Sequence, residues 1–521
     1  MVQIFLLAIA IFVIFVSLYM LWKTKIQAKN NSKVIINLPP EIPGAYFPIG
    51  HLYLFISKTP LALILANLAD KYGHIFSIRL GIHRAIIVSN REIVQECFTT
   101  NDKVLAGRPA SSAGIYLGYN NAAFGFADYG PYWRNIRKLV LLEVLSSKRL
   151  ERFKPIRVTE VETNIKELYS SILKSGSTNP SKVNMSKWFE QLTLNVIMKM
   201  ITGKRYKTED EKGRHFTRTT KEYMYESVQF VLSDVIPLPF LKWFDFQGRI
   251  KSMKKLSQEM DKIVTSWIDE HLMKRELAIK DDDQDFIDVL LSKIDEQFMY
   301  GYTRETIIKA TILNIILAGS DTTSIHLTWL LSLLLNNKHV MDQAQEEIDM
   351  KIGKERWVEE CDIKNLVYLQ AIVKETLRLY PPGPLAIPHA AMDDCTVGGY
   401  KVPKGTRLMV NVWKLHRDPQ TWSDPEKFMP ERFMKSHSEI DISDQNFEFI
   451  PFGSGRRSCP GITFAMQVTH LTLARLLQGF NFSTLGDLPV DLTVGNSITL
   501  PKANPLEVFV MPRLAPMLYQ Y

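Results

Sequence analysis

The sequence is poor in cysteine, and none of its cysteines has the spacing of a common metal or redox motif. The 521 residues include four of them, Cys97, Cys361, Cys395 and Cys459, and no two form CxxC. This spacing excludes a zinc ribbon and a thioredoxin-type redox site. So few cysteines in so long a chain do not form a disulfide scaffold, and we therefore expect a reducing compartment.

The sequence also lacks internal repeats, low-complexity tracts and dense runs of lysine or arginine. Its 63 basic and 55 acidic residues give a formal net charge of +8 at pH 7. This mild excess of positive charge favours a membrane surface or an acidic protein as partner, and we expect no nucleic-acid partner.

Charged side chains are absent from residues 4–22, a stretch rich in isoleucine, leucine, valine and phenylalanine. At about 1.5 Å per residue, a helix of this length just spans a hydrocarbon core of about 30 Å. Four lysines follow within residues 23–33, so the positive-inside rule places the rest of the chain in the cytosol. No positive region precedes the stretch and no A-x-A-like site follows it, which disfavours a cleaved signal peptide.

These features predict three parts in the chain. Residues 1–24 are a membrane anchor, residues 25–50 are a basic and Pro-rich hinge, and residues 51–521 are one large domain. Four prolines between residues 39 and 48 would make the hinge a stiff spacer between the membrane and the domain.

The domain is predicted to be mainly α. Residues 130–380 have amphipathic spacing and few prolines, which is typical of helices. β-branched residues around glycine turns predict small hairpins at residues 76–89 and 395–413. The polar run at residues 278–285 is predicted to be a surface loop between two helices.

The longest predicted helix spans residues 303–335 and is capped by Thr303. It is apolar on nearly every face and is therefore expected to be buried. Its centre, residues 318–323, reads AGSDTT. Glycine and four adjacent polar residues reduce the stability of a buried helix. A bend satisfied by serine and threonine back-bonding is one explanation, and a functional site is the other.

Residues 452–461, FGSGRRSCPG, cannot form the interior of a helix or strand, because glycine and proline are unfavourable in both. They precede a predicted helix, whose N–H groups and dipole would stabilise a thiolate at Cys459. Arg457 adds a permanent positive charge. A nucleophilic cysteine and a metal thiolate both fit, but no partnering histidine or oxyanion signature supports the nucleophile.

The same ten residues match F-x-x-G-x-R-x-C-x-G and resemble the haem-ligand loop of the cytochromes P450, in which a cysteine thiolate holds the iron. Further segments match the family's motifs in the family's order: WxxxR at Trp133 and Arg137, AGSDTT, ExxR at Glu375 and Arg378, and PERF at residues 430–433. The resemblance covers residues 39–515 and implies the P450 fold, one large helical domain with small β-sheets. The hinge, residues 125–138 and the hydrophobic anchor resemble the plant microsomal branch. Within this branch, residues 117–133 and 243–261 are most similar to a subgroup that oxidises alkaloids, terpenoids and phenolics.

The resemblance implies haem b (iron protoporphyrin IX) as cofactor and Cys459 as the ligand of its iron. Contacts with the haem are expected from Trp133, Arg137, Ala318, Gly319, His389, Phe452, Arg457 and Gly461. The arginines and Trp133 would pair with the propionates, whereas an ordinary core or surface histidine is an equal alternative for His389. Asp321 and Thr322 would be the catalytic pair that delivers protons to O2.

The resemblance further implies a buried ion network of Glu375, Arg378 and Arg432 that holds the cysteine loop. The substrate pocket would be lined by Asn314, Ala318 and residues 112–126, 385–387 and 497–499. Residues 236–245 would enter the membrane or form a buried loop.

The implied activity is that of a monooxygenase in the endoplasmic reticulum membrane, single-pass, with a cytosolic catalytic domain. The chain lacks a GxGxxG loop and a flavin segment, so electrons would come from NADPH-cytochrome P450 reductase. Arg134, Lys138 and Arg456 could meet the acidic surface of this partner, or form a solvated face.

The substrate would be small and hydrophobic, and we favour hydroxylation of an alkaloid of the benzylisoquinoline type. A terpenoid or a furanocoumarin is the alternative substrate. An isomerase or dehydratase that needs no external electrons, and a tethered haem protein without turnover, are the alternative functions.

Overall fold

The structure is a computed structural model that describes residues 37–520. Within this span it does not describe residues 175–180, 207–209, 230, 237–240, 242–244, 278–284, 296–299 and 443–445. The predicted anchor, the first part of the hinge and most of residues 236–245 therefore lie outside the described residues. In the described parts of the chain, no helix combines the length and apolar composition needed to cross a membrane.

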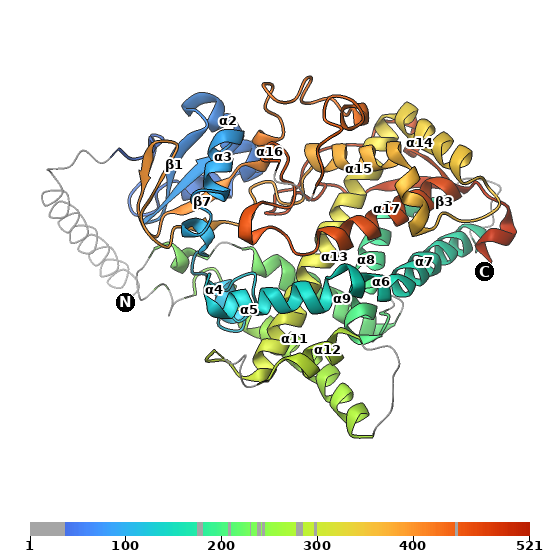
Figure 1. The fold of residues 1–521 in the computed structure, drawn as a ribbon, viewed down its shortest axis with the longest axis horizontal. Helices are drawn as coiled ribbons and strands as arrows, with labels where there is room; N and C mark the ends of the chain where they lie inside the picture. Colours follow the sequence, from blue (N-terminus) through green and yellow to red (C-terminus); the bar gives the residue numbers. More distant parts are fainter. Residues whose placement is uncertain are drawn as a thin grey trace, which may run out of the picture.

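The domain is mainly helical, as predicted (Figure 1). The helices of its first half are α2 (Leu61–Tyr72), α3 (Arg91–Phe98), α4 (Ser112–Tyr116), α5 (Pro131–Leu139), α6 (Ser147–Arg152), α7 (Lys154–Lys174), α8 (Met185–Thr202) and α9 (Glu211–Ser227). Those of its second half are α11 (Arg249–Glu276), α12 (Phe286–Lys293), α13 (Arg304–Asn336), α14 (Lys338–Lys351), α15 (Val367–Leu379), α16 (Val412–Leu415) and α17 (Ile462–Gly479). A π-helical turn at Val140–Val144 extends α5.

Three small sheets complete the fold. The largest has the strand order β1 (Ile75–Leu80), β2 (His83–Val88), β7 (Arg407–Val410) and β4 (His389–Ala390). A second has the order β3 (Ser181–Asn184), β9 (Glu507–Pro512) and β8 (Phe480–Ser483), and β5 (Cys395–Val397) pairs with β6 (Tyr400–Val402). Figure 1 shows the largest sheet with α2 and α3 at one end of the molecule and most helices at the other.

The predicted hairpin at residues 76–89 is confirmed and turns at Gly81, which has a φ of +62°. The predicted hairpin at residues 395–413 is only partly correct. Its first half forms the β5–β6 hairpin, but β7 leaves it and pairs in parallel with β2. The pairing with β2 buries the apolar side chains of β7, which an isolated hairpin would expose.

α13 confirms the longest predicted helix and crosses the whole domain (Figure 1). Thr303 caps it, because its Oγ1 accepts a hydrogen bond from Thr306 N at 3.1 Å. The predicted back-bonding is present at its polar centre: Ser320 Oγ donates to Ile316 O, and Thr322 Oγ1 donates to Ala318 O, both at 2.7 Å. These bonds satisfy the hydroxyl donors while the helix continues without interruption.

The described part of the Pro-rich segment lies along β1. Ser77 N donates to Pro40 O at 2.7 Å, Ile42 N donates to Ser77 O at 3.1 Å, and Arg79 pairs with Glu41 at 2.7 Å. The chain is therefore attached to the largest sheet from about residue 40 onward.

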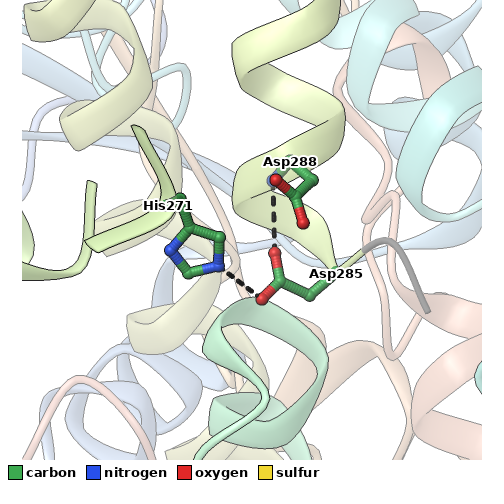
Figure 2. A group of neighbouring side chains, drawn as sticks. All are labelled: His271, Asp285 and Asp288. Carbon is green, nitrogen blue, oxygen red and sulfur yellow. Dashed lines mark hydrogen bonds and ion pairs between the residues drawn. The ribbon is translucent and has the colours of Figure 1, made fainter. Parts of the chain in front are cut away.

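α11 and α12 are joined by a polar cluster of His271, Asp285 and Asp288 (Figure 2). Nδ1 of His271 lies 2.6 Å from Trp267 O, and Nε2 lies 2.7 Å from Asp285 Oδ2. Both of these neighbours are acceptors, so both ring nitrogens must carry hydrogen and the ring is an imidazolium. Although burial opposes the charge, the hydrogen bond and charge of Asp285 raise the pKa of His271. Asp285 also caps α12 by accepting from Asp288 N, so the cluster is a structural ion pair.

Candidate active site

Cys459 lies in a tight loop directly before α17. Its backbone N donates to Phe452 O at 2.9 Å, and its Sγ accepts from Gly461 N at 3.4 Å. Gly453 and Gly455 both have a φ of +69°, in the left-handed region that favours glycine. A Cβ on Gly455 would also lie 2.4 Å from Asp102 Oδ1. The loop therefore depends on glycine to present the sulfur.

Burial raises the pKa of the Cys459 thiol, although the Gly461 N–H and the charge of Arg137 act in the opposite direction. Burial therefore opposes the thiolate, while the N–H at the helix start favours it, as the sequence suggests. A metal ion deprotonates a coordinating thiol outright, so this environment suits a metal ligand better than a free nucleophile.

Two of the predicted arginines, Arg137 and Arg457, lie beside the loop and close to the Trp133 ring. Arg137 donates to Ser458 O at 2.6 Å, and Arg457 donates to Ala106 O at 2.6 Å. The guanidinium carbons of Arg137 and Arg457 lie 5.3 and 4.6 Å from the centre of the buried Trp133 ring. The ring is thus a platform for both cations, while its N–H donates to a loop carbonyl at 3.1 Å.

A third arginine, Arg108, joins this group and has no counterpart among the predicted residues. Its side chain donates to Gly125 O, Ile387 O and Pro388 O. Burial, followed by the charges of Arg457 and Arg137, lowers the pKa of Arg108 to about 9. In the sequence, Arg108 precedes a proline and belongs to no motif with a recognisable spacing.

The three arginines have more positive charge than the surrounding protein neutralises. Asp128 is the carboxylate that acts on Arg108 and Arg457, and its Oδ1 accepts from the backbone N of Arg108 at 3.1 Å. All three arginines are half-buried, and charges partly removed from water are costly unless they are paired. The cluster therefore fits an anionic group with two carboxylates, as the propionates of haem b would provide.

His389 lies in β4 next to this cluster. It is buried, and its Nδ1 lies 2.7 Å from Leu105 O. Burial, followed by the charge of Arg108, lowers the pKa of His389 to about 3. The neutral ring must donate from Nδ1 to the carbonyl, which leaves Nε2 as an acceptor. Contact with a propionate would need a second proton on the ring, so this predicted role stays a prediction.

The middle of α13 has an accessible stripe, although residues 307–313 and 323–334 of the helix are buried. Ala318 is exposed, and Asn314 and Thr322, one turn before and after it, are half-buried. Gly319 packs against α8, because a Cβ there would lie 2.6 Å from Ile197 Cδ1. The structure thus gives Gly319 a packing role besides the expected one of leaving room for O2.

Asp321 is next to this stripe, and its pKa lies close to neutral pH. Burial, followed by the negative charge of Glu190, raises its pKa to about 6, while Lys221 and a hydrogen bond with Thr499 act in the opposite direction. Glu190 on α8 and Lys221 on α9 form an ion pair with each other. Thr322 Oγ1 uses its hydrogen for Ala318 O, so its lone pairs are left to accept.

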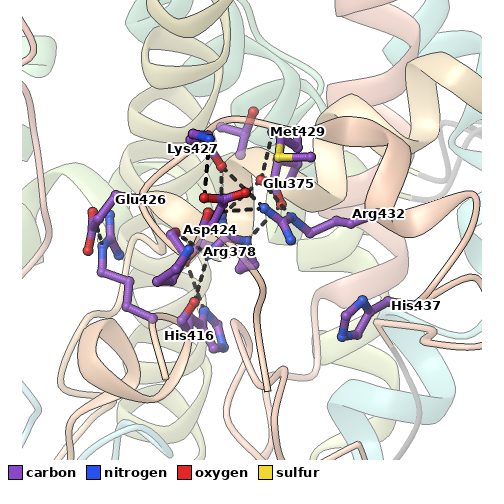
Figure 3. Close-up of polar contacts among 12 residues, drawn as sticks. Glu375, Arg378, His416, Asp424, Glu426, Lys427, Met429, Arg432 and His437 are labelled. Carbon is purple, nitrogen blue, oxygen red and sulfur yellow. Dashed lines mark hydrogen bonds and ion pairs between the residues drawn. The ribbon is translucent and has the colours of Figure 1, made fainter. Parts of the chain in front are cut away.

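The predicted ion network of Glu375, Arg378 and Arg432 is confirmed (Figure 3). Arg378 donates to Glu375 through Nε and Nη2 at 2.7 and 2.8 Å, and Arg432 Nε donates to Glu375 Oε1 at 3.0 Å. All three residues are buried. Arg378 also donates to His416 O and Pro425 O, so the network joins α15 to the segment before the loop.

The helical fold, the cysteine loop and the excess of positive charge beside it define a haem-thiolate protein. The family model described as Cytochrome P450 matches residues 39–506. The chain belongs to the cytochrome P450 family and, within it, to the plant CYP82 family.

Two plant relatives are similar over nearly their whole length. Nicotine N-demethylase CYP82E3 of Nicotiana tomentosiformis is 50% identical, with 96% of each chain covered. Vinorine hydroxylase of Rauvolfia serpentina is 50% identical, with 99% of this chain and 98% of the relative covered. A solved structure of a zebra fish cytochrome P450 with progesterone has a TM-score of 0.71 at 27% identity, and covers 87% of this chain and 100% of that chain. The chain is therefore a haem-containing monooxygenase with the P450 fold.

Proposed function

We propose that this monooxygenase hydroxylates a small hydrophobic metabolite of plant specialised metabolism, with an alkaloid of the benzylisoquinoline type as the favoured substrate. The relatives named for nicotine and vinorine support an alkaloid. The observation that carries the proposal is the accessible stripe on α13, where an acid and a hydroxyl adjoin the exposed Ala318.

Haem b would be held by Cys459 at its iron and by the arginine group of Arg108, Arg137 and Arg457 at its propionates. Phe452 and Gly461 would fix the sulfur through their backbone groups, as in the hydrogen bonds of the loop. When bound, haem supplies the activation of O2 and the transfer of one oxygen atom to the substrate.

Asp321 and Thr322 supply and position a proton. With a pKa near 6, Asp321 can take up and release a proton near neutral pH. Glu190 and Lys221 connect it to the surface, since their side chains are 37% and 53% exposed. The lone pairs of Thr322 Oγ1 can accept from a water molecule and hold it beside Ala318.

Replacement of Thr322 by alanine tests this role in the enzyme reconstituted with reductase. The variant should consume NADPH at a rate within a few-fold of wild type. Most of the NADPH should nevertheless be diverted to hydrogen peroxide, because the water molecule that Thr322 holds beside Ala318 is lost. Thr323→Ala is the matched control, since Thr323 is buried away from the accessible stripe. Unchanged coupling of NADPH to product in Thr322→Ala would refute the role.

The reductase would bind the face formed by α5 and the cysteine loop. Arg134, Lys138 and Arg456 are exposed there, together with Leu142 at 56% exposure. These residues border an open groove of about 430 Å³ that also contains Trp133. Positive charge around an apolar groove fits a partner with an acidic surface, as NADPH-cytochrome P450 reductase is expected to have.

The proposed location is the endoplasmic reticulum membrane, with the catalytic domain in the cytosol. Large apolar side chains are exposed close to the start of the described chain: Tyr46, Phe47, Ile49, Tyr53 and Ile56. This surface would lie against the lipid near the anchor. The sequons at Asn30, Asn184 and Asn481 should be unglycosylated, so a mass shift after deglycosylation would contradict the topology.

The substrate test uses microsomes with reductase and a panel of alkaloids, terpenoids and furanocoumarins. Binding spectra would identify ligands, and mass spectrometry would identify products. Product formation should require NADPH, whereas product without NADPH would point to the isomerase or dehydratase alternative.

A further inference from the structure

Asn314 places an amide on the accessible stripe of α13. It precedes Ala318 by four residues, so the two side chains lie on one face of the helix, about 6 Å apart along its axis. Asn314 is half-buried and lies within an apolar stretch of the helix, residues 312–318, in which it is the polar residue. A polar group in apolar surroundings is costly without hydrogen-bond partners. The partners of the Asn314 amide therefore indicate which kind of group would bind next to it.

The orientation of the amide is fixed by the backbone of Gly125. Gly125 N lies 2.8 Å from the Asn314 oxygen Oδ1. A backbone N–H can only donate, so the atom facing it must be the oxygen, and the NH2 group must point elsewhere. A Cβ on residue 125 would lie 2.7 Å from Oδ1, so glycine is what allows this close contact.

The loop that holds the amide is itself anchored. Gly125 O accepts from Arg108 Nε at 3.1 Å, and Phe124 O accepts from Trp133 Nε1 at 3.1 Å. The loop therefore has little freedom to follow a rotation of the Asn314 side chain. The amide is preorganised before any ligand arrives.

The NH2 group of Asn314 has no hydrogen-bond partner within the described part of the chain. It carries two donors and no formal charge. We propose that Asn314 determines specificity by donating a hydrogen bond to a neutral oxygen acceptor, a carbonyl or ether, on the substrate beside Ala318. This inference rests on the proposed function and adds to it the substrate group that is recognised.

The same orientation acts against a positively charged group at this position. A protonated amine has no lone pair to accept the hydrogen bond, and it would face two N–H dipoles. In an alkaloid substrate, the group near Asn314 is therefore an oxygen, and the basic nitrogen lies elsewhere.

The test compares two probes of nearly equal shape, coumarin, which has a lactone carbonyl, and 2H-chromene, which lacks it. Their dissociation constants are measured from substrate-induced difference spectra of the full-length holoenzyme. Wild type should bind coumarin about 5- to 10-fold more tightly, as expected for one neutral hydrogen bond. Asn314→Leu should abolish this preference by weakening coumarin alone.

Gly125→Ala is a second variant that retains Asn314 but displaces its oxygen, and it should also abolish the preference. Ile315→Val is the matched control on the same helix, since it changes volume without removing a polar group, and it should keep the preference. The carbon monoxide spectrum of each variant verifies that the haem site is folded.

Absence of a preference in wild type, or a preference retained in Asn314→Leu, would overturn the inference. Difference spectra report binding without turnover. A failure of the proposed monooxygenase activity on these compounds would therefore be recognised separately from a failure of this inference.

Discussion

Arg108 is a half-buried cation whose side chain makes no hydrogen bond to a carboxylate in the described part of the chain. Its hydrogen bonds go to uncharged carbonyl oxygens, and two further arginines lie close enough to lower its pKa. An anion at this position gains charge-assisted hydrogen bonds, which are roughly twice as strong as neutral ones. Arg108 is therefore expected to help retain haem b.

Replacement of Arg108 by glutamine keeps a hydrogen-bond donor but removes the charge. The variant should lose haem about 10- to 100-fold more readily, corresponding to a charge-assisted bond of about 1.5–3 kcal/mol. Transfer of haem to an excess of an apo acceptor protein measures this rate. Arg134 is exposed and lies on α5 near the same arginines, so Arg134→Gln should retain haem as wild type does. Equal haem loss in the two variants would contradict the role of Arg108.

Among single residues, the sequence was most informative where a motif fixes both residue type and spacing. Trp133, Arg137, Arg457 and Cys459 were predicted to lie together, and the structure brings them together. Arg108 was missed because its partners are backbone carbonyls from distant segments, which leave no pattern in the sequence.

At the scale of elements, the His271–Asp285 pair attaches the end of α11 to the start of α12 (Figure 2). The hydrogen bond and charge of Asp285 raise the pKa of His271 in the folded protein above its usual value, despite burial. A raised pKa means that the folded state binds the proton more tightly than the unfolded state. The pair therefore stabilises the fold at low pH and loses this contribution as pH rises through the pKa of the folded state.

We expect α12 to become less protected at alkaline pH. After correction for the intrinsic rate, hydrogen exchange of its amides should be faster at pH 9 than at pH 6, because the neutral ring has one hydrogen for two acceptors. His271→Gln should remove this dependence on pH. Protection that is the same at both pH values in wild type would contradict an imidazolium at this position.

Elements were predictable when their signals are local. The limits of α13 follow from the Thr303 cap and a long apolar run, and the predicted and observed limits differ by one residue at each end. The position of β7 was not predictable, because its partner β2 lies about 320 residues earlier in the chain. Parallel pairing over such a separation depends on the whole fold and leaves no local signal.

At the scale of the whole molecule, a chain of polar contacts connects α15 to the haem-ligand loop. Figure 3 shows its first part, from Glu375 and Arg378 to His416. Arg378 donates to His416 O, and Nε2 of His416 accepts from Ile450 N at 3.0 Å. Two residues later, Phe452 O accepts from Cys459 N. The ion network therefore supports the position of the sulfur through backbone groups.

Arg378→Ala would leave Glu375 buried with only Arg432 as its charged partner. We expect a loss of about 3 kcal/mol or more in the free energy of unfolding, and protein that is recovered largely without haem. The ratio of haem to protein and thermal unfolding measure both effects. Lys427→Ala removes an exposed pair with Asp424, and should cost less than about 1 kcal/mol. Full haem content in Arg378→Ala would rule out the supporting role.

Three buried histidines, His326, His389 and His416, and the half-buried His470 make the whole fold sensitive to acid. Burial is the main cause of the low pKa values, about 3 for His326, His389 and His416 and about 4 for His470. Neither ring nitrogen of His326 has a hydrogen-bond partner among the described residues. In His416 both nitrogens are occupied in the neutral form, since Nδ1 lies 3.2 Å from Arg378 O and Nε2 accepts from Ile450 N.

The pKa of each histidine is therefore lower in the folded state than in the unfolded state, where it is about 6.5. Below pH 6.5 the unfolded chain binds more protons, so stability must fall as pH decreases toward the folded pKa values. Each group contributes up to about 1.4 kcal/mol per pH unit, so the four together contribute about 5 kcal/mol per unit between roughly pH 5.5 and 4. Chemical unfolding of the holoenzyme at a series of pH values should show this steep loss. In the double variant His326→Gln and His470→Gln, the histidine contribution should be roughly halved, because the remaining two histidines still titrate. A change of the free energy of unfolding with pH that is identical to wild type would contradict the role of these histidines.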